Sequence, residues 1–249
     1  MNELILKRNF SKVAASYDNF AYLQKEIGLN LIKKMAASCR PFKILDIGTG
    51  TGWLTGQLKT KFPNAKFFGI DFAEGMIVYA NKKKLKCNFL VSDALGLPFK
   101  DRYFDILISN ATYQLVDNYK QAFSQVRRVL KKNGIFYFSC FGSKTLVELR
   151  QAINQGIINF KLPRKENILS GLLDSGFKNI DIKIYSKKEY FKNAFDLVKW
   201  LKAIGANNLS KPQFFTKHIW QEINKKYLSN FSDKEKIFAT FEVFEVKCL

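Results

Sequence analysis

Three glycines at alternate positions, Gly48, Gly50 and Gly52, follow a short apolar run and precede a segment with a helical pattern. The run spans residues 42–47 and has the length and composition of a buried strand. Glycine lets the backbone turn tightly and approach a ligand at a point where a Cβ atom would collide. The stretch Asp46-Ile47-Gly48-Thr49-Gly50-Thr51-Gly52 therefore predicts a strand, a ligand-binding turn and a helix in succession.

The segments after this turn alternate between strand and helix patterns. Short β-branched or aromatic runs with polar or glycine boundaries predict further strands at 66–70, 87–91, 104–109 and 135–141. Helical patterns lie between most of them, such as residues 74–83 and 118–130. Strand, helix and strand at this spacing predict a doubly wound α/β fold, with a mostly parallel sheet and helices on both of its faces.

Two ligand-binding motifs compete for the glycine turn. A dinucleotide-binding G-x-G-x-x-G would place its third glycine where Trp53 stands, and this bulky side chain would spoil the close contact of helix and strand that the motif needs. Asp46, two positions before Gly48, followed by G-x-G-x-G, instead resembles motif I of the class I S-adenosylmethionine-dependent methyltransferases. We therefore expect a seven-stranded Rossmann-like sheet with an antiparallel edge strand, and S-adenosyl-L-methionine as the cofactor.

Two more carboxylates stand at predicted strand ends, where this family would use them. Asp71 ends the second strand, and its ionised carboxylate could accept hydrogen bonds from both hydroxyls of a ribose. Asp93 ends the third strand and is similar to the family's contact to the adenine amino group. A lone aspartate is more often a helix cap or a turn residue, but three successive strand ends with Asp46, Asp71 and Asp93 favour a shared site.

The two ends of the chain add helices to this core. The first forty residues read as helix, and the last hundred predict helices at 143–158, 166–175, 193–204 and 217–227 and strands at 178–190 and 237–247. We expect one domain over 1–249, with a helical cap (1–40), a cofactor-binding core (41–141) and a C-terminal part (142–249). Insertions at about 143–160 and 193–230 would form a lid, because ligands bind at the carboxyl ends of such strands.

Composition excludes several classes of site. The four cysteines (Cys39, Cys87, Cys140 and Cys248) form no C-x-x-C pair, and the single histidine, His218, has no neighbouring ligand types, so no metal site is expected. No signal sequence is apparent, and no stretch approaches the roughly 18 apolar residues that a membrane span requires. The expectation is a cytoplasmic protein that binds no membrane.

The formal charge of +20, from 41 Lys and Arg against 21 Asp and Glu, favours an anionic partner. The lysines are spread through the chain, so compositional bias and a functional basic face both stay open. Nucleic acid is the less favoured partner. The stretch Ser109-Asn110-Ala111-Thr112 after the fourth strand lacks the Asn/Asp-Pro-Pro-aromatic motif of adenine methyltransferases, and no Pro-Cys nucleophile occurs.

Further segments of the chain resemble one particular family within the class I methyltransferases. Residues 9–12, 15–18, 23–24, 73–76, 141–143, 145–152 and 201–208 look like the malonyl-[acyl-carrier protein] O-methyltransferases of biotin synthesis. Thr49 stands where many members of this family have cysteine, a change of little consequence if backbone atoms make the contacts. The resemblance implies methylation of the free carboxylate of a malonyl thioester on an acidic acyl-carrier protein, which the basic surface would dock. A carboxylate is ionised at neutral pH, so no catalytic base is needed.

The resemblance also implies roles for individual residues. Arg150 is the candidate that holds the substrate carboxylate through its two-pronged guanidinium, and Tyr17 is a second catalytic candidate. The cofactor contacts that we expect are Tyr17, Gln24, Asp46, Gly48, Thr49, Gly50, Gly52, Asp71, Phe72, Met76, Asp93, Ala94 and Asn110. An exposed helical arginine and core packing of Tyr17 are the alternative interpretations.

Other functions are compatible with the same motifs. A methyltransferase of a small metabolite, such as a quinone precursor, would keep the fold and need no carrier protein. An RNA-modifying or RNA-binding protein would bind with a steep salt dependence. A cofactor-binding regulator would transfer nothing. The sequence leaves the oligomeric state open.

Overall fold

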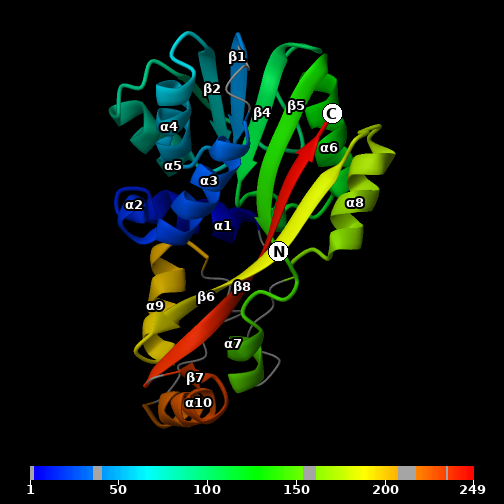
Figure 1. Ribbon diagram of the computed structural model, residues 1–249. Helices are drawn as coiled ribbons and strands as arrows, with labels where there is room; N and C mark the ends of the chain where they lie inside the picture. The colour runs from blue at the N-terminus through cyan, green and yellow to red at the C-terminus, as the bar shows by residue number, and fades with distance from the viewer. Residues whose placement is uncertain (1–2, 36–40, 154–160, 207–216, 234) are drawn as a thin grey trace.

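The computed structural model describes residues 3–35, 41–153, 161–206, 217–233 and 235–249. Its centre is one sheet with the strand order β3-β2-β1-β4-β5-β8-β6, to which the short β7 adds by pairing with β8 (Figure 1). The strands are β1 (Lys43–Ile47), β2 (Lys66–Asp71), β3 (Asn88–Val91), β4 (Phe104–Asn110), β5 (Leu130–Phe141), β6 (Asp181–Phe191), β7 (Ser232–Asp233) and β8 (Lys236–Cys248).

Strands β3, β2, β1, β4 and β5 run parallel, and β8 is antiparallel to both β5 and β6. The predicted mostly parallel sheet with antiparallel pairing at one edge is confirmed, and the two-residue β7 extends it. The strand order reverses at β1, which lies between β2 and β4. In such sheets the crevice at the carboxyl ends of the strands beside the reversal is where ligands bind.

Helices cover both faces of the sheet because alternate residues of the central strands point to opposite sides. Ile44 and Ile106 belong to a core with α3 and α4, whereas Leu45 and Leu107 belong to a core with α6 and α8. The helices are α1 (Glu3–Val13), α2 (Tyr17–Phe20), α3 (Tyr22–Lys34), α4 (Trp53–Lys61), α5 (Glu74–Lys82), α6 (Tyr119–Val129), α7 (Val147–Ala152), α8 (Lys165–Asp174), α9 (Ala194–Ala203), α10 (Lys217–Asn230) and the 3-10 turn η1 (Tyr113–Leu115).

The C-terminal part forms a third core beyond the main sheet. Strands β6 and β8 extend past the other strands, and α7, α9 and α10 gather along this extension (Figure 1). Leu23 and Ile27 of α3 join the same core, so the N-terminal helices and the C-terminal insertion share buried contacts. Among the described residues, no helix is long and apolar enough to cross a bilayer.

The helix predicted from residue 143 begins later, at Val147. Residues 143–146 form turns instead, because the backbone N–H groups of Lys144 and Leu146 donate to the Glu242 carboxylate and to the Thr240 carbonyl of β8. Leu146 takes a left-handed conformation with φ of 57°. The helix ends at Ala152, and most of the rest of the predicted range, residues 154–158, lies outside the described residues.

Helix α1 packs closely on α5 at Gly75. The Gly75 N–H donates to Ser11 Oγ over 3.1 Å, and a Cβ atom at Gly75 would stand 2.6 Å from backbone atoms of Ser11. The backbone of α1 would have to move to admit even a methyl group. This contact therefore fixes α1 against the cofactor-binding core.

We predict that Gly75→Ala displaces α1 and lowers the free energy of unfolding by about 1–3 kcal/mol, the usual cost of overpacking. Urea unfolding measures this change. Gly96→Ala is the matched control, because a Cβ atom at Gly96 meets no atom within 4 Å. Equal stability of the two variants would show that α1 is not held at this contact.

Candidate functional site

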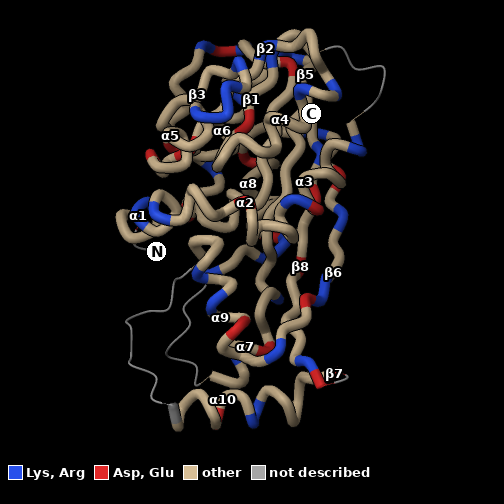
Figure 2. The backbone as a smooth tube through the Cα atoms, turned by 90° about the vertical axis from the view of Figure 1, so that its left-hand side faces the viewer, with Lys and Arg blue, Asp and Glu red and all other residues tan. Residues whose placement is uncertain are grey.

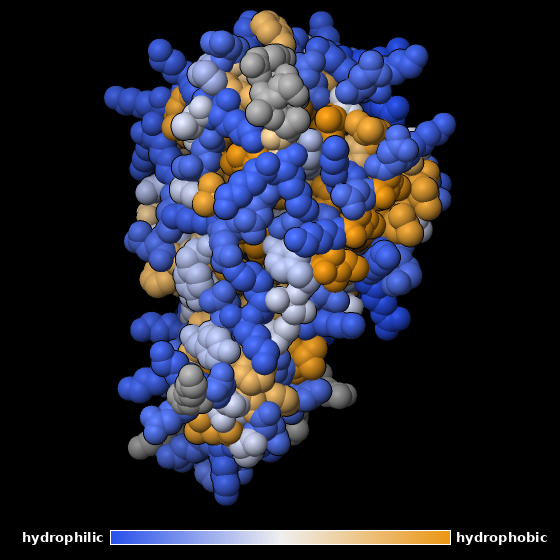
Figure 3. All heavy atoms as spheres, viewed as in Figure 1, coloured by the Kyte–Doolittle hydropathy of each residue, from blue (hydrophilic) through white to orange (hydrophobic). Residues whose placement is uncertain are grey.

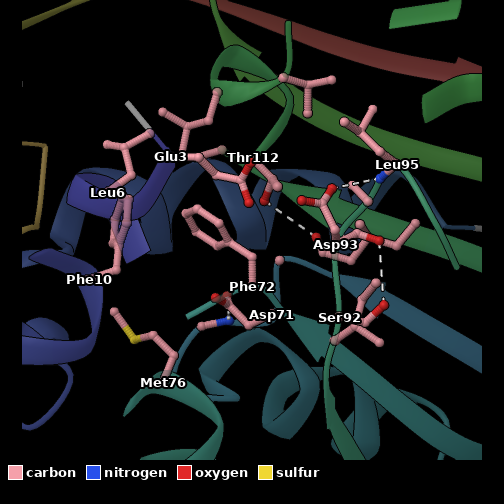
Figure 4. A pocket seen from close by; sticks show the side chains of 18 of the residues that line it. Glu3, Leu6, Phe10, Asp71, Phe72, Met76, Ser92, Asp93, Leu95 and Thr112 are labelled. Atoms are coloured by element: carbon pink, nitrogen blue, oxygen red, sulfur yellow. Dashed lines mark hydrogen bonds between the residues drawn. The ribbon is translucent and has the colours of Figure 1, made fainter. Parts of the chain in front are cut away.

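The carboxyl ends of β1, β2, β3 and β4 surround a cavity of about 170 Å³. Figure 4 shows Asp71, Phe72 and Met76 on one side of it and Asp93 with Leu95 on another, while Leu6 and Phe10 of α1 face them. The cavity therefore lies between the core sheet and the N-terminal helix. We call it the main cavity.

The predicted glycine turn has the conformation that requires glycine. Gly48, Gly50 and Gly52 have φ angles of 70°, 55° and 75°, in the left-handed region that other residues rarely adopt. Gly48 and Gly50 line the main cavity, and a Cβ atom at Gly50 would meet nothing within 4 Å. The backbone at Gly50 is therefore open to a ligand. Gly52 lines neither the main cavity nor the smaller cavity beside the turn, and it is the N-cap of α4, where a Cβ atom would stand 2.9 Å from the Phe89 ring.

Asp71 is fixed at the end of β2 by two backbone donors. The N–H of Gly50 donates to Oδ2 and the N–H of Ala73 to Oδ1, each over 2.9 Å. Burial raises the pKa of Asp71 to about 6, although these two hydrogen bonds oppose the rise. Each carboxylate oxygen can accept a second hydrogen bond. Asp71 therefore presents two fixed acceptors to the cavity, as a diol would need.

Asp46 carries an orphaned buried oxygen. Thr49 and Thr55 donate to its Oδ2 over 2.9 and 2.8 Å, whereas Oδ1 has no partner. Burial raises the pKa of Asp46 to about 6. Buried Gln24 Oε1 also lacks a partner, and both residues line a smaller cavity of about 50 Å³ beside the glycine turn. Two acceptors without donors in a confined space fit a cationic group with several N–H bonds.

The other predicted cofactor residues have varied surroundings. Phe72, Met76, Asp93, Ala94 and Asn110 line the main cavity. The Leu95 N–H donates to Asp93 Oδ1 over 2.7 Å, so this carboxylate is oriented by its own turn. The Asn110 side chain links α3 to β5, because its Nδ2 donates to the Gln24 carbonyl and its Oδ1 accepts from Ser139 Oγ. Thr49 lines the smaller cavity. The cofactor contacts of these residues stay predictions.

Tyr17 stands where the cavities meet, since it lines the main cavity, the smaller cavity and a third one. Burial, and then the charges of Asp71 and Asp18, raise its pKa, so its hydroxyl stays protonated and can donate. The neighbouring Asp18 holds α2 in place. It accepts from Thr51 Oγ1 over 2.7 Å and forms an ion pair with Lys83 over 2.6 Å.

The third cavity, of about 80 Å³, was not predicted, and we call it the apolar cavity. It shares Leu6, Phe10, Tyr17, Ala111 and Leu115 with the main cavity. Its other described lining residues are Gln24, Gln114, Phe141, Thr145, Leu146, Leu162, Leu201, Ile204, Ala206 and Phe241, none of them charged. Gln114 Oε1 is buried without a partner, while its Nε2 donates to the Ala111 carbonyl over 2.5 Å. No sequence pattern singled out Gln114.

Arg150 lines neither the main nor the apolar cavity in the described structure. Its Nη2 donates to the carbonyls of Ser143 and Thr145 over 2.6 and 2.8 Å, which braces the turn before α7. Thr145 lines the apolar cavity, so Arg150 supports its wall from behind. The predicted contact between Arg150 and a substrate carboxylate stays a prediction, and this conformation gives it no direct support.

Comparison with known proteins matches residues 45–138 to the model of a methyltransferase domain family. The chain is 31% identical over 242 residues to malonyl-[acyl-carrier protein] O-methyltransferase 1 of Ilyobacter polytropus, covering 94% of this chain and 90% of the relative. The chain belongs to the malonyl-[acyl-carrier protein] O-methyltransferase family. It is 31% identical over 211 residues to a biotin biosynthesis bifunctional protein of Cellvibrio japonicus, covering 83% of this chain and 41% of that protein.

Among solved structures, phosphoethanolamine N-methyltransferase 2 of Haemonchus contortus, in complex with S-adenosyl-L-methionine, superposes with a TM-score of 0.61 and 18% identity. The match covers 95% of this chain and 56% of that one. The predicted fold, enzyme class and cofactor of this methyltransferase family member are thereby confirmed. Its residues fit S-adenosyl-L-methionine, because Asp71 offers acceptors to a ribose diol and the orphaned oxygens of Asp46 and Gln24 suit an ammonium group.

We predict that affinity for S-adenosyl-L-methionine falls as the pH is lowered through about 6. Asp46 and Asp71 have pKa values of about 6, so below this pH each must lose a proton before it can act as an ionised acceptor. The slope of log Kd against pH should then approach two protons per cofactor. Isothermal titration calorimetry between pH 5 and 8 measures it.

Asp71→Asn is the matched variant, since it keeps the shape and removes one of the two titrating groups. It should bind the cofactor more weakly at pH 8 and show a slope near one proton. An affinity that does not change with pH would show that neither carboxyl group has to ionise for binding.

Proposed function

We propose that this methyltransferase transfers a methyl group from S-adenosyl-L-methionine to the free carboxylate of a malonyl thioester carried by acyl-carrier protein, in biotin synthesis. The observation that carries the proposal is the apolar cavity, which adjoins the main cavity and has no charged side chain among its described lining residues. The name of the Ilyobacter polytropus relative supports this reaction, and the name of the Cellvibrio japonicus protein supports its place in biotin synthesis.

The described lining of the apolar cavity holds no charged side chain that could act as a base, and this nucleophile needs none. A malonyl carboxylate is ionised at pH 7, because carboxylic acids titrate near pH ~4. The raised pKa of Tyr17 keeps its hydroxyl protonated, so Tyr17 serves as a hydrogen-bond donor at the junction of the cavities and not as a proton acceptor. What the chain contributes is alignment of donor and acceptor, a factor that can supply roughly 7–11 kcal/mol of the barrier.

The neutral lining of the apolar cavity favours the transfer electrostatically. S-adenosyl-L-methionine, when bound, supplies a methyl group on a positively charged sulfur, and the new bond joins that carbon to the carboxylate oxygen while the sulfur keeps the electron pair. Opposite charges disappear in this step. A surrounding of low polarity stabilises the separate charges less than water does, so it lowers the cost of reaching the less charged transition state.

The lining also favours a malonyl thioester over free malonate, which carries a second charged group. Leu162, Leu201 and Phe241 offer apolar walls that suit an uncharged thioester. A second charged group on the substrate would be buried there without a partner, which is costly. The ester product has lost its charge, so nothing in the cavity holds it by ion pairing.

The decisive test is intact-protein mass spectrometry of malonyl-loaded acyl-carrier protein after incubation with this enzyme and the cofactor. We expect one added methyl group on the malonyl form and none on an acetyl-loaded control, which lacks the carboxylate. If neither carrier gains mass while calorimetry shows cofactor binding, the proposal is wrong. The quinone-precursor type of substrate would then be tested next, and RNA after it.

We further predict that Arg150→Ala leaves cofactor affinity unchanged and lowers kcat/KM for malonyl-loaded carrier by about tenfold or more, as expected when a binding contact or its support is lost. Arg150 lies outside the main cavity, which is why the cofactor should not be affected. Arg128→Ala is a control for the loss of an arginine, since Arg128 bonds the Leu97 and Phe99 carbonyls away from both cavities. Unchanged malonyl methylation in Arg150→Ala would contradict the assignment.

A further inference from the structure

One wall of the apolar cavity reaches the surface where two segments of the chain meet. The Ser143 N–H donates to the Pro163 carbonyl over 2.9 Å, which sets the turn at 143–146 beside the segment at 161–164. Thr145 and Leu146 from the first segment and Leu162 from the second line the cavity. Leu162 is only partly buried, so this wall forms part of the cavity mouth.

Four basic residues stand on this wall, each exposed and each within three positions of a lining residue: Lys144, Lys161, Arg164 and Lys165. We call them the basic rim. Glu166 is the exposed acidic neighbour, Arg150 adds a partly buried positive charge behind the turn, and Glu242, which accepts from the Lys144 N–H, is buried. Among the ion pairs within the described residues, none includes a member of the rim.

The position of the rim distinguishes it from the general excess of lysine. Figure 2 shows Lys and Arg spread over every part of the chain, and hydrophilic side chains cover most of the face in Figure 3. Several lysines elsewhere are already paired, such as Lys34 with Glu245 and Lys131 with Asp105, both over 2.6 Å. The main cavity, in contrast, is lined by the acidic Glu3, Asp93 and Asp117. Exposed basic residues near other lining residues, such as Arg8 and Lys202, lie on α1 and beside Leu201 on α9, whereas the rim is the basic group on the wall formed by 143–146 and 161–164.

Resting on the proposed function, we infer that the basic rim docks the acidic surface of the acyl-carrier protein and receives the phosphodiester of its prosthetic arm. The apolar cavity requires the thioester and the anionic parts of the substrate to bind in different places. An apolar cavity without a charged lining residue accepts the uncharged thioester, but burial of a phosphate there would be costly. The anionic part of the substrate has to stay at the mouth, where the rim supplies complementary charge.

The test reverses two charges of the rim in Lys144→Glu/Arg164→Glu. For malonyl-loaded carrier we expect KM to rise about tenfold or more with little change in kcat, because charged contacts at an interface rim act mainly on encounter and docking. Kinetics with malonyl-N-acetylcysteamine, which has the thioester but neither phosphate nor carrier, should match the wild type. The salt dependence of KM for the carrier should also become weaker.

Lys100→Glu/Lys132→Glu is the matched control, since both lysines are exposed, neither lines the main or the apolar cavity, and the net charge changes equally. It should behave as the wild type. If Lys144→Glu/Arg164→Glu is poorly folded by circular dichroism, Lys161→Glu/Lys165→Glu tests the same rim.

The outcomes separate the two proposals. Unchanged KM for the carrier in folded rim variants overturns the docking inference and leaves the proposed reaction intact. Equal losses in the rim and control variants also overturn it, because net charge alone would then explain the effect. Failure of the wild type to methylate malonyl-N-acetylcysteamine and the loaded carrier alike would instead refute the proposed function.

Discussion

The N–H of Gly50 donates to Asp71 Oδ2 over 2.9 Å, and this bond joins the turn after β1 to the end of β2. It forms only because the turn takes left-handed conformations at Gly48 and Gly50 that bring the Gly50 N–H to Asp71. The same turn lets Thr49 donate from its hydroxyl to Asp46, so both buried carboxylates depend on it. Gly48 and Gly50 of this turn line both the main cavity and the smaller cavity.

Burying the Asp46 and Asp71 carboxylates is unfavourable in the free protein, because burial raises the pKa of each, and the charge of Asp71 adds a smaller rise at Asp46. The expected cofactor contacts would account for their retention, because an ammonium group would supply hydrogen bonds and opposite charge to Asp46 and a ribose diol would donate to Asp71. The N-terminal helices α1 and α2 close one side of the main cavity. Asp18 connects α2 to the glycine turn through Thr51 and to the C-cap of α5 through Lys83, and Trp200 of α9 donates to the Phe20 carbonyl over 2.9 Å. Core, cap and C-terminal insertion thus meet around one site.

The sequence could predict those parts of the site in which a strand and a chemically useful residue stand next to each other in a short stretch of chain. The glycine turn, Asp71 and Asp93 each follow an apolar run, and parallel strands bring their carboxyl ends together, so their proximity follows from local signals. The start of α7 was misplaced because residues 143–146 bond to Thr240 and Glu242, which lie almost a hundred positions away. The apolar cavity could not be predicted for the same reason. Leu6, Phe141, Leu201 and Phe241 come from four distant elements, and as isolated apolar residues they are indistinguishable from core.

The three regions of the site differ in charge in a way that suits the proposed reaction. Acidic groups line the main cavity, the described lining of the adjoining apolar cavity is neutral, and the positive charge of the basic rim stands outside. A lysine or arginine inside the cavity would bind the carboxylate more tightly but would stabilise the charged reactant more than the less charged transition state. Placing Arg150 behind the wall, with its guanidinium on backbone carbonyls, keeps the wall rigid without adding that charge to the lining. In the proposed reaction, docking would depend on the charge of the basic rim, and no charged side chain in the described lining of the apolar cavity would oppose the loss of charge during methyl transfer.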